Sequence, residues 1–196
     1  MELDFDFFKV DEKYTIPARG KALISEPFLS DSYFKRSIVL LTEHSPEGAV
    51  GFVLNKKVNM NVSEVVKDFP QIESMVSIGG PVSTNTLHYI HSLGEAIPNS
   101  VEIMENIYWG GDFETVKEMI QIGMIRPYQI RFFLGYSGWM ANQLEGELER
   151  NSWVVSNINA SEIMDVKTNS LWYDMLNNVG KKYRLWKNFP ENPAFN

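Results

Sequence analysis

Apolar runs along the chain predict its strands. The run at 38–41 is apolar without interruption, which is typical of a strand buried on both faces. The residues SPEG at 45–48 favour a tight turn between two such runs, so a β-hairpin is predicted there. The full set of predicted strands covers 22–25, 37–42, 49–54, 75–78, 87–91, 130–134 and 153–155.

Helical spacing of apolar residues predicts short helices between these strands. Asn61 can cap a helix at its start, Glu64 stands at the reciprocal capping position, and Pro70 ends the pattern. Asp112 can cap another helix, which Gly123 ends. The predicted helices cover 62–69, 113–120, 140–148, 161–166 and 171–179.

The stretch 131–153, RFFLGYSGWMANQLEGELERNSW, is predicted to form a strand, a tight turn, a helix and a second strand. The turn is placed at 135–138, where two glycines flank Tyr136 and Ser137. This arrangement would put Ser137 and the first helical N–H groups at the end of a sheet, where ligand sites are common. The glycine pair at 79–80 predicts a positive φ or a close backbone approach.

Strands and helices alternate without a strict βαβ order, which favours an α+β fold over a doubly wound sheet. The 196 residues, of which 44% are apolar, suffice for a single compact domain. We expect an N-terminal arm at 1–19, a domain at 20–180 and a C-terminal strap at 181–196, of which the tail NFPENPAFN at 188–196 should cross the surface irregularly. The arm is expected to pack its aromatic side chains on the body or on a second subunit. These side chains are Phe5, Phe7, Phe8 and Tyr14.

The net charge of −7 is unfavourable for a nucleic-acid-binding surface, because such surfaces need clustered lysines and arginines to neutralise phosphates. One basic cluster occurs near the C-terminus. It consists of Lys181, Lys182, Arg184 and Lys187, with Tyr183 and Trp186 between them. The aromatics could stack bases, but the interpretation we favour is a solvated basic face over two packed aromatics.

The chain contains no cysteine, which excludes disulfides, thiolate catalysis and thiolate metal ligands. Its first ten residues carry acids where a secretory signal needs basic residues, and no apolar run approaches the roughly 20 residues of a membrane span. A cytoplasmic location without membrane contact is therefore expected. The signatures of nucleotide-binding loops and of HExxH zinc proteases are absent from the sequence.

Five segments stand out by their order along the chain. They are GKALISEPFLSDSYFKRSIVLLTEHSPEGAVGFVLN at 20–55, GGPV at 79–82, LHYIHS at 87–92, YWGGDF at 108–113 and the stretch at 131–153. In this order they resemble the AlgH/YqgE family of bacterial proteins, and the termini are similar to those of Bacteroides-type members. The resemblance implies a cytoplasmic protein with a mixed α+β fold of coiled, bifurcated sheets. It supplies no catalytic residue set and no cofactor, although some members carry the label of transcriptional regulator.

Ser137 is a candidate nucleophile, because a strand precedes its turn and a helix follows, with His44 or His91 as the base. A nucleophile elbow reads G-x-S-x-G, however, and Trp139 stands here in place of the second glycine. We therefore favour a structural role, in which Ser137 caps the helix and the flanking glycines form the turn. An anion site at the start of that helix is a further alternative.

His44 stands beside Glu43 at the mouth of the predicted hairpin, and together with His91 the pair could form an acid–base or metal site. The interpretation we favour is that these histidines are hydrogen-bonded to backbone. His88 and His91 cannot chelate one metal from a strand, because side chains three positions apart point to opposite faces. No metal site is predicted.

Arg36 and Arg131 lie in apolar strand contexts, where a charged side chain needs a partner. A carboxylate such as Glu43 or Glu145 could serve, and so could the phosphate of a ligand. The acids at 145, 147 and 149 are otherwise expected to form a solvated face of the predicted helix.

The sequence favours a regulatory or interaction protein, without an established enzyme activity, that binds a small anionic ligand. The ligand site is expected where the predicted turns meet. Its expected lining is Arg36, His44, Gly79, Gly80, Gly135, Tyr136, Gly138 and Trp139. One alternative is a hydrolase that uses Ser137 or the His44–Glu43 pair in the same cleft. A DNA-binding transcriptional regulator is the second, against which the acidic charge argues. A protein partner is also expected, and no cofactor is predicted.

Overall fold

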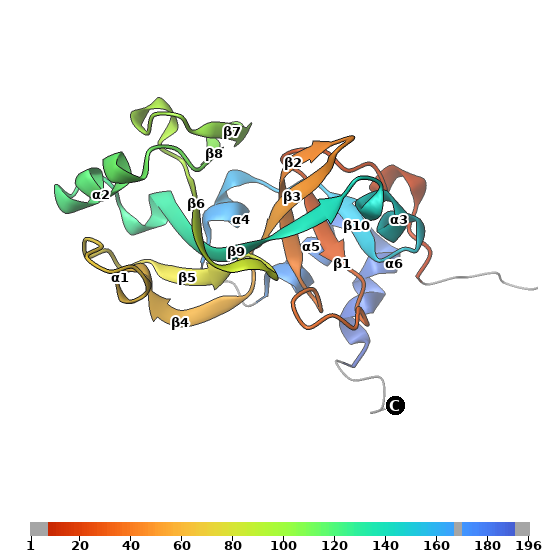
Figure 1. Cartoon of the computed structure of the whole chain (residues 1–196). Coiled ribbons are helices and arrows are strands. Elements are labelled where there is room, and N and C mark those ends of the chain that lie inside the picture. The colour runs from red at the N-terminus through yellow and green to blue at the C-terminus, as the bar shows by residue number, and fades with distance from the viewer. Residues whose placement is uncertain (1–7, 167–169, 191–196) are drawn as a thin grey trace, which may run out of the picture.

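Strands and short helices form an α+β fold in the computed structural model of the chain, which describes residues 8–166 and 170–190 (Figure 1). The strands are β1 (Ala22–Ser25), β2 (Ile38–Ser45), β3 (Gly48–Val53), β4 (Lys57–Asn61), β5 (Met75–Ile78), β6 (Val82–His91), β7 (Val101–Met104), β8 (Ile107–Trp109), β9 (Ile130–Met140) and β10 (Trp153–Ser156). The α-helices are α1 (Val62–Val65), α2 (Phe113–Gln121), α3 (Gln143–Glu149), α4 (Ala160–Met164), α5 (Leu171–Val179) and α6 (Lys181–Arg184). Within the described residues, no helix combines the length and the apolar character that crossing a bilayer requires.

Strand β9 joins the two parts of one large sheet. The strands follow the order β10-β1-β2-β3-β9-β6-β8-β7, and β5 pairs with β9 from outside this path and carries β4. All pairs are antiparallel except β5 with β9. The first part of β9 lies between β5 and β6, whereas its last residues pair with β3, so the sheet divides at this strand. The bifurcated sheet that the family resemblance implied is therefore confirmed.

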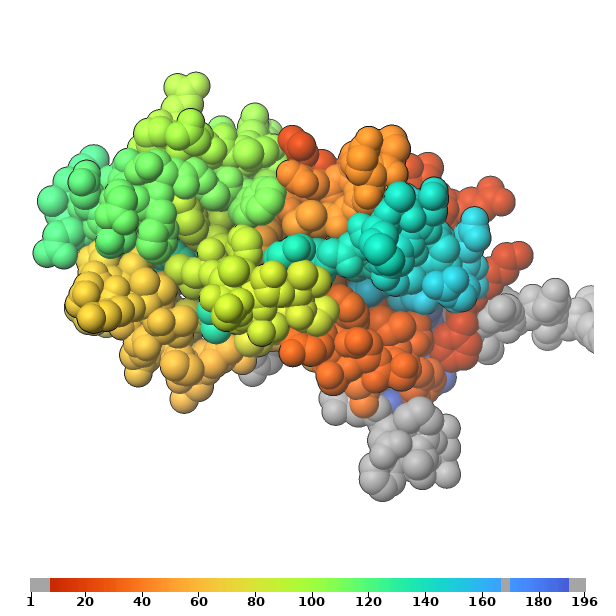
Figure 2. Space-filling view, in the orientation of Figure 1, coloured from red at the N-terminus to blue at the C-terminus, as the bar shows by residue number. Residues whose placement is uncertain are grey.

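The division of the sheet produces two lobes. One lobe contains β1, β2, β3 and β10 with α3 and α5 against them, and the other contains β4 to β8 with α1 and α2 (Figure 1). In the space-filling view the lobes meet along the middle of the molecule (Figure 2). One hydrophobic core spans both, since Phe52 of β3 and Phe133 of β9 share it with Ile90 of β6 and Trp172 of α5. Buried apolar surface therefore holds the lobes together.

Local capping signals place two helices where the sequence predicts them. The Oδ1 atom of Asp112 accepts a hydrogen bond of 2.7 Å from the N–H of Thr115 at the start of α2. The Glu64 carboxylate accepts a hydrogen bond of 2.6 Å from the N–H of Asn61, which forms a capping box at α1. Helix α1 is shorter than the predicted 62–69, because the backbone becomes extended directly after its single turn.

The predicted tight turn at 135–138 is wrong, because β9 runs through it without a break. Pairing with β3 and β6 keeps these residues within the strand, with Ser137 opposite Gly51 and Tyr136 opposite Val82, although Gly135 has a φ of 64°. Non-local pairing thus overrides the local preference of glycine and serine for turns. The helix that follows begins only at the start of α3, after a residue with left-handed backbone.

Each predicted strand overlaps an observed one, but the sequence patterns miss β4, β7, β8, the first part of β6 and the last part of β9. Residues 82–86 of β6 read VSTNT and give no alternating apolar signal. The pairing of β6 with β9 also shifts register between Val82 and Leu87, and Ser83 has a φ of 48°. An irregular, polar strand of this kind can be identified from its pairing in the structure, because its composition gives no strand signal.

The strap predicted at 181–196 begins with two helical segments. Helix α6 is followed by a 3-10 helix, Leu185–Asn188, and together they bury Tyr183 and Trp186. The predicted packing of two aromatics beneath the basic cluster is therefore confirmed. Residues 191–196 of the predicted strap lie outside the described residues.

The N-terminal arm packs on the body through its aromatic residues. The ring centroid of Phe8 lies 5.6 Å from that of Phe189, and the ring of Tyr14 meets that of Tyr183 edge-on at 5.5 Å. The predicted packing of the arm is confirmed for these two side chains. The other aromatic residues of the predicted arm, Phe5 and Phe7, lie outside the described residues.

Two glycines allow the chain after β5 to approach the backbone of β9 closely. A Cβ atom at Gly79 would lie 2.2 Å from the carbonyl oxygen of Gly135, and one at Gly80 would lie 2.3 Å from that of Tyr136. Gly80 also has a φ of 155°. Any side chain at these positions would collide with backbone, so the close approach predicted for the pair is confirmed. We call this contact the glycine junction.

Replacing Gly79 by alanine tests the packing of the glycine junction. We expect Gly79→Ala to lower the free energy of unfolding by about 3 kcal/mol, because the added Cβ would meet backbone and not a movable side chain. The control is Gly146→Ala in α3, where the atom nearest to an added Cβ is Nη1 of Arg150 at 3.5 Å. This change should be neutral or should stabilise by up to about 1 kcal/mol, because alanine favours helix. Urea unfolding measures both variants, and equal effects would contradict the close approach.

Candidate functional site

Arg131 lies in β9 with 1% of its surface exposed. Its guanidinium donates to the carbonyl oxygens of Ile163 and Leu54, the latter at 2.8 Å, and to the hydroxyl of Ser77 at 3.2 Å. Burial, partly offset by the negative charge of Asp165, lowers the pKa of Arg131 to about 10, so the side chain stays charged at neutral pH. Carbonyl oxygens thus take the place of the predicted carboxylate partner, and this arginine holds structure together.

Ser137 is fully buried in β9, with 0% of its surface exposed. Its hydroxyl donates a hydrogen bond of 3.0 Å to the carbonyl oxygen of Gly79 and so belongs to the glycine junction. A nucleophile must reach its substrate, and a helix cap must precede a helix. The predicted role of Ser137 as a helix cap is therefore wrong, and its burial argues against the catalytic alternative.

His44 contacts a different carboxylate from the one predicted. Its Nε2 atom lies 2.9 Å from Oε1 of Glu145 in α3, and this hydrogen bond lowers the pKa of Glu145. Glu43 is exposed, and its side chain points away from that of His44, because neighbouring side chains of a strand point to opposite faces. The predicted His44–Glu43 pair is wrong, since the fold supplies the partner from a helix distant in sequence.

Glu147 joins two tryptophans on the same side of α3. Its Oε2 atom accepts hydrogen bonds from the indole N–H groups of Trp139 at 3.0 Å and of Trp153 at 2.8 Å. Both indole rings are buried, with 5% and 0% of their surfaces exposed, respectively. The predicted solvated face is therefore wrong for Glu147, whereas Glu145 keeps 45% of its side chain exposed and Glu149 is exposed as expected. Trp139, a predicted ligand contact, instead packs within the lobe.

Arg36 reaches the C-terminal part of the chain. Its Nη1 atom donates to the Tyr173 hydroxyl at 2.6 Å, and its Nη2 atom donates to the carbonyl oxygen of Phe189 at 2.5 Å. The guanidinium also lies 5.1 Å from the ring centroid of Trp172, which is a cation–π distance. This side chain fastens α5 and the chain after the 3-10 helix to the start of β2.

The histidines of β6 pack into the other lobe. Nε2 of the buried His91 lies 3.0 Å from the Ser100 hydroxyl and 3.0 Å from the carbonyl oxygen of Gly110. Burial lowers the pKa of His91, and the hydrogen bond to the Gly110 backbone opposes this shift. The favoured prediction of a backbone-bonded histidine is confirmed for His91. His88 instead packs its ring against Phe52 at 5.4 Å between centroids.

The residues predicted to line one cleft take part in three separate contacts. The side chain of Arg36 meets α5, and that of His44 meets α3. The glycines at 79, 80 and 135 pack against each other's strands at the glycine junction, where backbone atoms fill the space. The sequence thus identifies residues that organise the fold, and a ligand site must be sought elsewhere.

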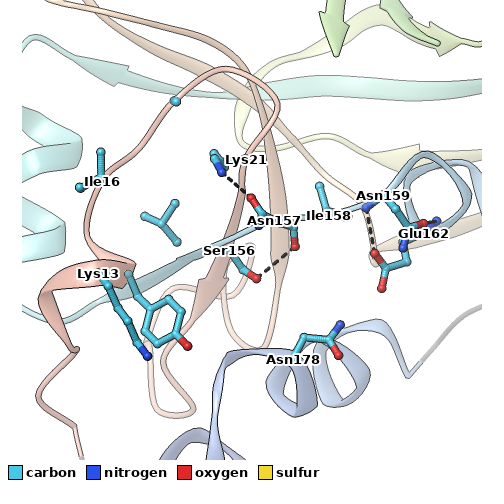
Figure 3. A pocket seen from close by; sticks show the side chains of 12 residues that line it. Lys13, Ile16, Lys21, Ser156, Asn157, Ile158, Asn159, Glu162 and Asn178 are labelled. Atoms are coloured by element: carbon cyan, nitrogen blue, oxygen red, sulfur yellow. Dashed lines mark hydrogen bonds between the residues drawn. The ribbon is translucent and has the colours of Figure 1, made fainter. Parts of the chain in front are cut away.

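A cavity of about 750 Å³ lies between the N-terminal arm, the end of β10 and α5 (Figure 3). We call it the arm cavity. Its charged and amide side chains are Lys13, Lys21, Asn157, Asn159, Glu162 and Asn178. Figure 3 shows Lys21 directed at Asn157, with Lys13 on another wall and Asn178 on the helix that closes the cavity from a third side.

The side chains of the arm cavity favour a negatively charged occupant. The ammonium group of Lys21 donates to Oδ1 of Asn157, and Nζ of Lys13 lies 4.7 Å from the ring centroid of Tyr14. Glu162 is the one carboxylate among the described residues of the lining, and its Oε2 atom accepts a hydrogen bond of 2.9 Å from the N–H of Asn159. Two lysines and one glutamate give the lining a positive charge in a chain whose net charge is −7.

Sequence reasoning misses the arm cavity, because its wall is assembled from three distant segments. The arm supplies 13–21, the end of β10 and the start of α4 supply 155–162, and α5 supplies Asn178. The asparagines at 157 and 159, placed directly after a strand, are the one local signal of a polar site. These asparagines could have indicated the position of the cavity, but they could not have indicated that Lys13 and Lys21 lie opposite them.

Comparisons with known proteins agree with this architecture. A family model described as AlgH-like matches residues 22–184. The chain belongs to the AlgH-like family. The UPF0301 protein of Bacteroides thetaiotaomicron is 43% identical over 197 residues, which cover 100% of both chains. The UPF0301 protein of Parabacteroides distasonis is 42% identical over 193 residues, which cover 97% of this chain and 98% of the relative. The Bacteroides-type resemblance of the sequence is thus confirmed.

Two solved structures share the fold of this AlgH-like chain. Protein DIP2367 from Corynebacterium diphtheriae superposes with a TM-score of 0.72 at 22% identity, covering 89% of this chain and 93% of that one. The AlgH protein from Pseudomonas aeruginosa superposes with a TM-score of 0.70 at 24% identity, covering 92% and 96%. Lys13 and Lys21 precede the residues that the family model matches, so the arm side of the cavity lies outside that match.

The contact of Glu147 with the two indoles predicts that substitutions of Glu147 and Glu149, both in α3, differ in their effect on stability. We expect Glu147→Ala to lower the free energy of unfolding by about 2 kcal/mol or more, because two buried indole N–H groups lose their acceptor. The control is Glu149→Ala, which removes an exposed acid from the same helix and should change stability by no more than about 0.5 kcal/mol. Chemical denaturation followed by circular dichroism measures both. Similar values for the two variants would contradict the structural role of Glu147.

Proposed function

We propose that this protein binds a small anionic ligand in the arm cavity and acts through binding rather than turnover, as a regulatory or interaction protein. The observation that carries the proposal is the lining, in which two lysines and several asparagine amides surround one cavity with a single carboxylate. Ammonium and amide N–H groups donate hydrogen bonds, and the oxygen atoms of carboxylates and phosphates accept them. The volume of about 750 Å³ lies within the range of small-molecule pockets.

The donors of the arm cavity retain capacity for a ligand. The ammonium group of Lys21 has three N–H donors, and its hydrogen bond to Asn157 uses one of them. The hydrogen bond that Glu162 accepts from the backbone at the start of α4 keeps its carboxylate turned to the helix cap. An anion in the cavity would therefore meet cationic and amide donors first.

A ligand in this position would connect the arm to the body. Lys13 and Lys21 come from the N-terminal segment, whereas Asn157 follows β10 and Asn178 lies in α5. A ligand that contacts these segments together stabilises the arm in its observed position, because binding favours the state that offers the contacts. The surface formed by the arm would then depend on ligand concentration. The regulatory mechanism we propose is that a protein partner binds this surface only when the ligand holds the arm in place.

A hydrolase is less well supported than a binding protein. Ser137 is buried, and the side chain that His44 contacts is Glu145 and not Ser137. The described lining of the arm cavity contains no histidine that could activate a nucleophile. DNA binding is opposed by the net charge of −7. The expected cytoplasmic location stays a prediction.

A thermal-shift titration with defined anions tests the proposal. The probes are inorganic phosphate, citrate, glucose 6-phosphate and ATP, each titrated to saturation. A ligand at about one hundred times its dissociation constant should stabilise the native state by about 2.7 kcal/mol. We expect at least one probe to stabilise the wild-type protein saturably, and we expect Lys21→Gln to remove most of that gain, because the substitution removes a charged donor from the cavity.

The matched control is Lys67→Gln, which removes the same charge from an exposed position in the other lobe. This variant should retain the full ligand-induced shift. An equal loss in both lysine variants would show a general charge effect and would refute the site. Absence of stabilisation by all four anions would refute the anionic ligand. Release of phosphate from ATP or glucose 6-phosphate during the titration would refute binding without turnover.

A further inference from the structure

A second cavity lies in the other lobe, between β6, β8 and the start of α2. Its volume is about 370 Å³, and it shares no lining residue with the arm cavity. Side chains that line it include Leu87, His88, Tyr89, Trp109 and Phe113. We call it the ring cavity. Apart from Val66, its lining belongs to the segments LHYIHS at 87–92 and YWGGDF at 108–113, which the proposed function does not use.

Aromatic rings dominate the wall of the ring cavity. The ring centroids of His88 and Trp109 lie 6.4 Å apart, and those of Tyr89 and Phe113 lie 5.9 Å apart. Such spacings are those at which aromatic rings attract each other in stacked or edge-to-face arrangements. A planar ring entering the cavity would extend these contacts on both sides, whereas a non-planar aliphatic compound would not.

The described residues that line the ring cavity carry no formal charge at neutral pH. Burial lowers the pKa of His88, which keeps its imidazole neutral. Burial and the nearby charge of Asp112 raise the pKa of Tyr89 to about 12, and its hydroxyl donates a hydrogen bond of 2.6 Å to the carbonyl oxygen of Gly111. An anion would lose its hydration here without gaining a counter-ion, because the nearby charge of Asp112 is negative. The lining therefore favours an uncharged occupant over an anion, unlike that of the arm cavity.

The two glycines at the rim of the ring cavity differ in what surrounds them. A Cβ atom at Gly111 would lie 2.6 Å from the Ser100 hydroxyl, so this glycine is required by packing. A Cβ atom at Gly110 would have no neighbour within 4 Å, so this position faces open space. With a φ of 68°, Gly110 requires a residue that tolerates left-handed backbone. Glycine satisfies the backbone and also leaves the space open.

We propose that the ring cavity binds an uncharged, planar aromatic compound of one or two fused rings. The neutral aromatic wall selects the chemistry of the ligand, and the volume sets its size. An apolar cavity of about 150 Å³ accommodates benzene, so about 370 Å³ admits a two-ring compound with its immediate surroundings. This site differs in position and in ligand charge from the arm cavity, so the two proposals succeed or fail independently.

Heteronuclear NMR of the 15N-labelled protein tests the proposal with indole and adenine as probes. The indole N–H signal of Trp109, assigned with Trp109→Phe, should shift saturably on titration of at least one probe. The indole N–H groups of Trp139, Trp153 and Trp172 donate to acceptors inside the protein and serve as references that should not move. Cyclohexanol, which has no planar ring, should shift the Trp109 signal at least tenfold less effectively at equal concentration, because it cannot stack.

Gly110→Asn is the variant that fills the cavity, because asparagine tolerates left-handed backbone and its side chain would occupy the open space. We expect it to weaken the binding of indole or adenine about tenfold or more. The control is Gly123→Asn. Gly123 has a φ of 73° and also has no atom within 4 Å of an added Cβ, but it lies at the end of α2 outside the lining. This variant should bind as the wild type does.

The outcomes separate the proposal from its competitors. An unmoved Trp109 signal with both probes, or equal binding by Gly110→Asn and the wild type, would overturn it. Binding of cyclohexanol as strong as that of indole would show a generic apolar cavity and would overturn the planar-ring selectivity. A blocked tripeptide with a central tryptophan is titrated last. Binding of this peptide without binding of free indole would assign the cavity to a protein partner and would also overturn the proposal.

Discussion

The close packing of Gly79 and Gly80 against β9 is the constraint on which both lobes depend. It allows one strand to pair with β5 and β6 in one lobe and with β3 in the other. The carbonyl oxygen of Gly79 accepts hydrogen bonds from the N–H of Val53 and from the hydroxyl of Ser137, so a single peptide group is shared by several strands. A side chain here would separate strands whose apolar residues form a common core.

A buried cation in the same strand adds specificity to this arrangement. Burying a charge costs several kcal/mol unless hydrogen bonds compensate it, and Arg131 obtains that compensation from three directions. Leu54 directly follows β3, Ser77 belongs to β5, and Ile163 lies in the last turn of α4, where carbonyl oxygens lack partners within the helix. The arginine therefore fixes α4 against both lobes in a geometry that an apolar side chain would not impose.

Elements whose signals lie within a few residues follow from the sequence, and contacts between distant residues do not. Asp112 caps α2 as predicted, because the N–H group it accepts from is three residues away. Residues 135–138 have the composition of a turn, yet pairing with β3 and β6 keeps them within β9. The predicted ligand site did not form one cleft for the same reason. His44 bonds to Glu145, 101 positions along the chain, and the arm cavity needs the arm to fold back on β10 and α5.

The order of the strands along the chain determines when this fold can form during synthesis. Strands β3, β5 and β6 cannot complete their pairing until β9 has been synthesised, and β1 needs β10, which ends at Ser156. Before β9 is available, β3 lacks its second neighbour, and a hairpin of β2 and β3 would have an open edge beside the apolar run at 38–41. Such edges pair readily with other chains, and long-range pairing is slow to form. The order of the strands therefore leaves apolar edges exposed to aggregation until β9 and β10 are in place.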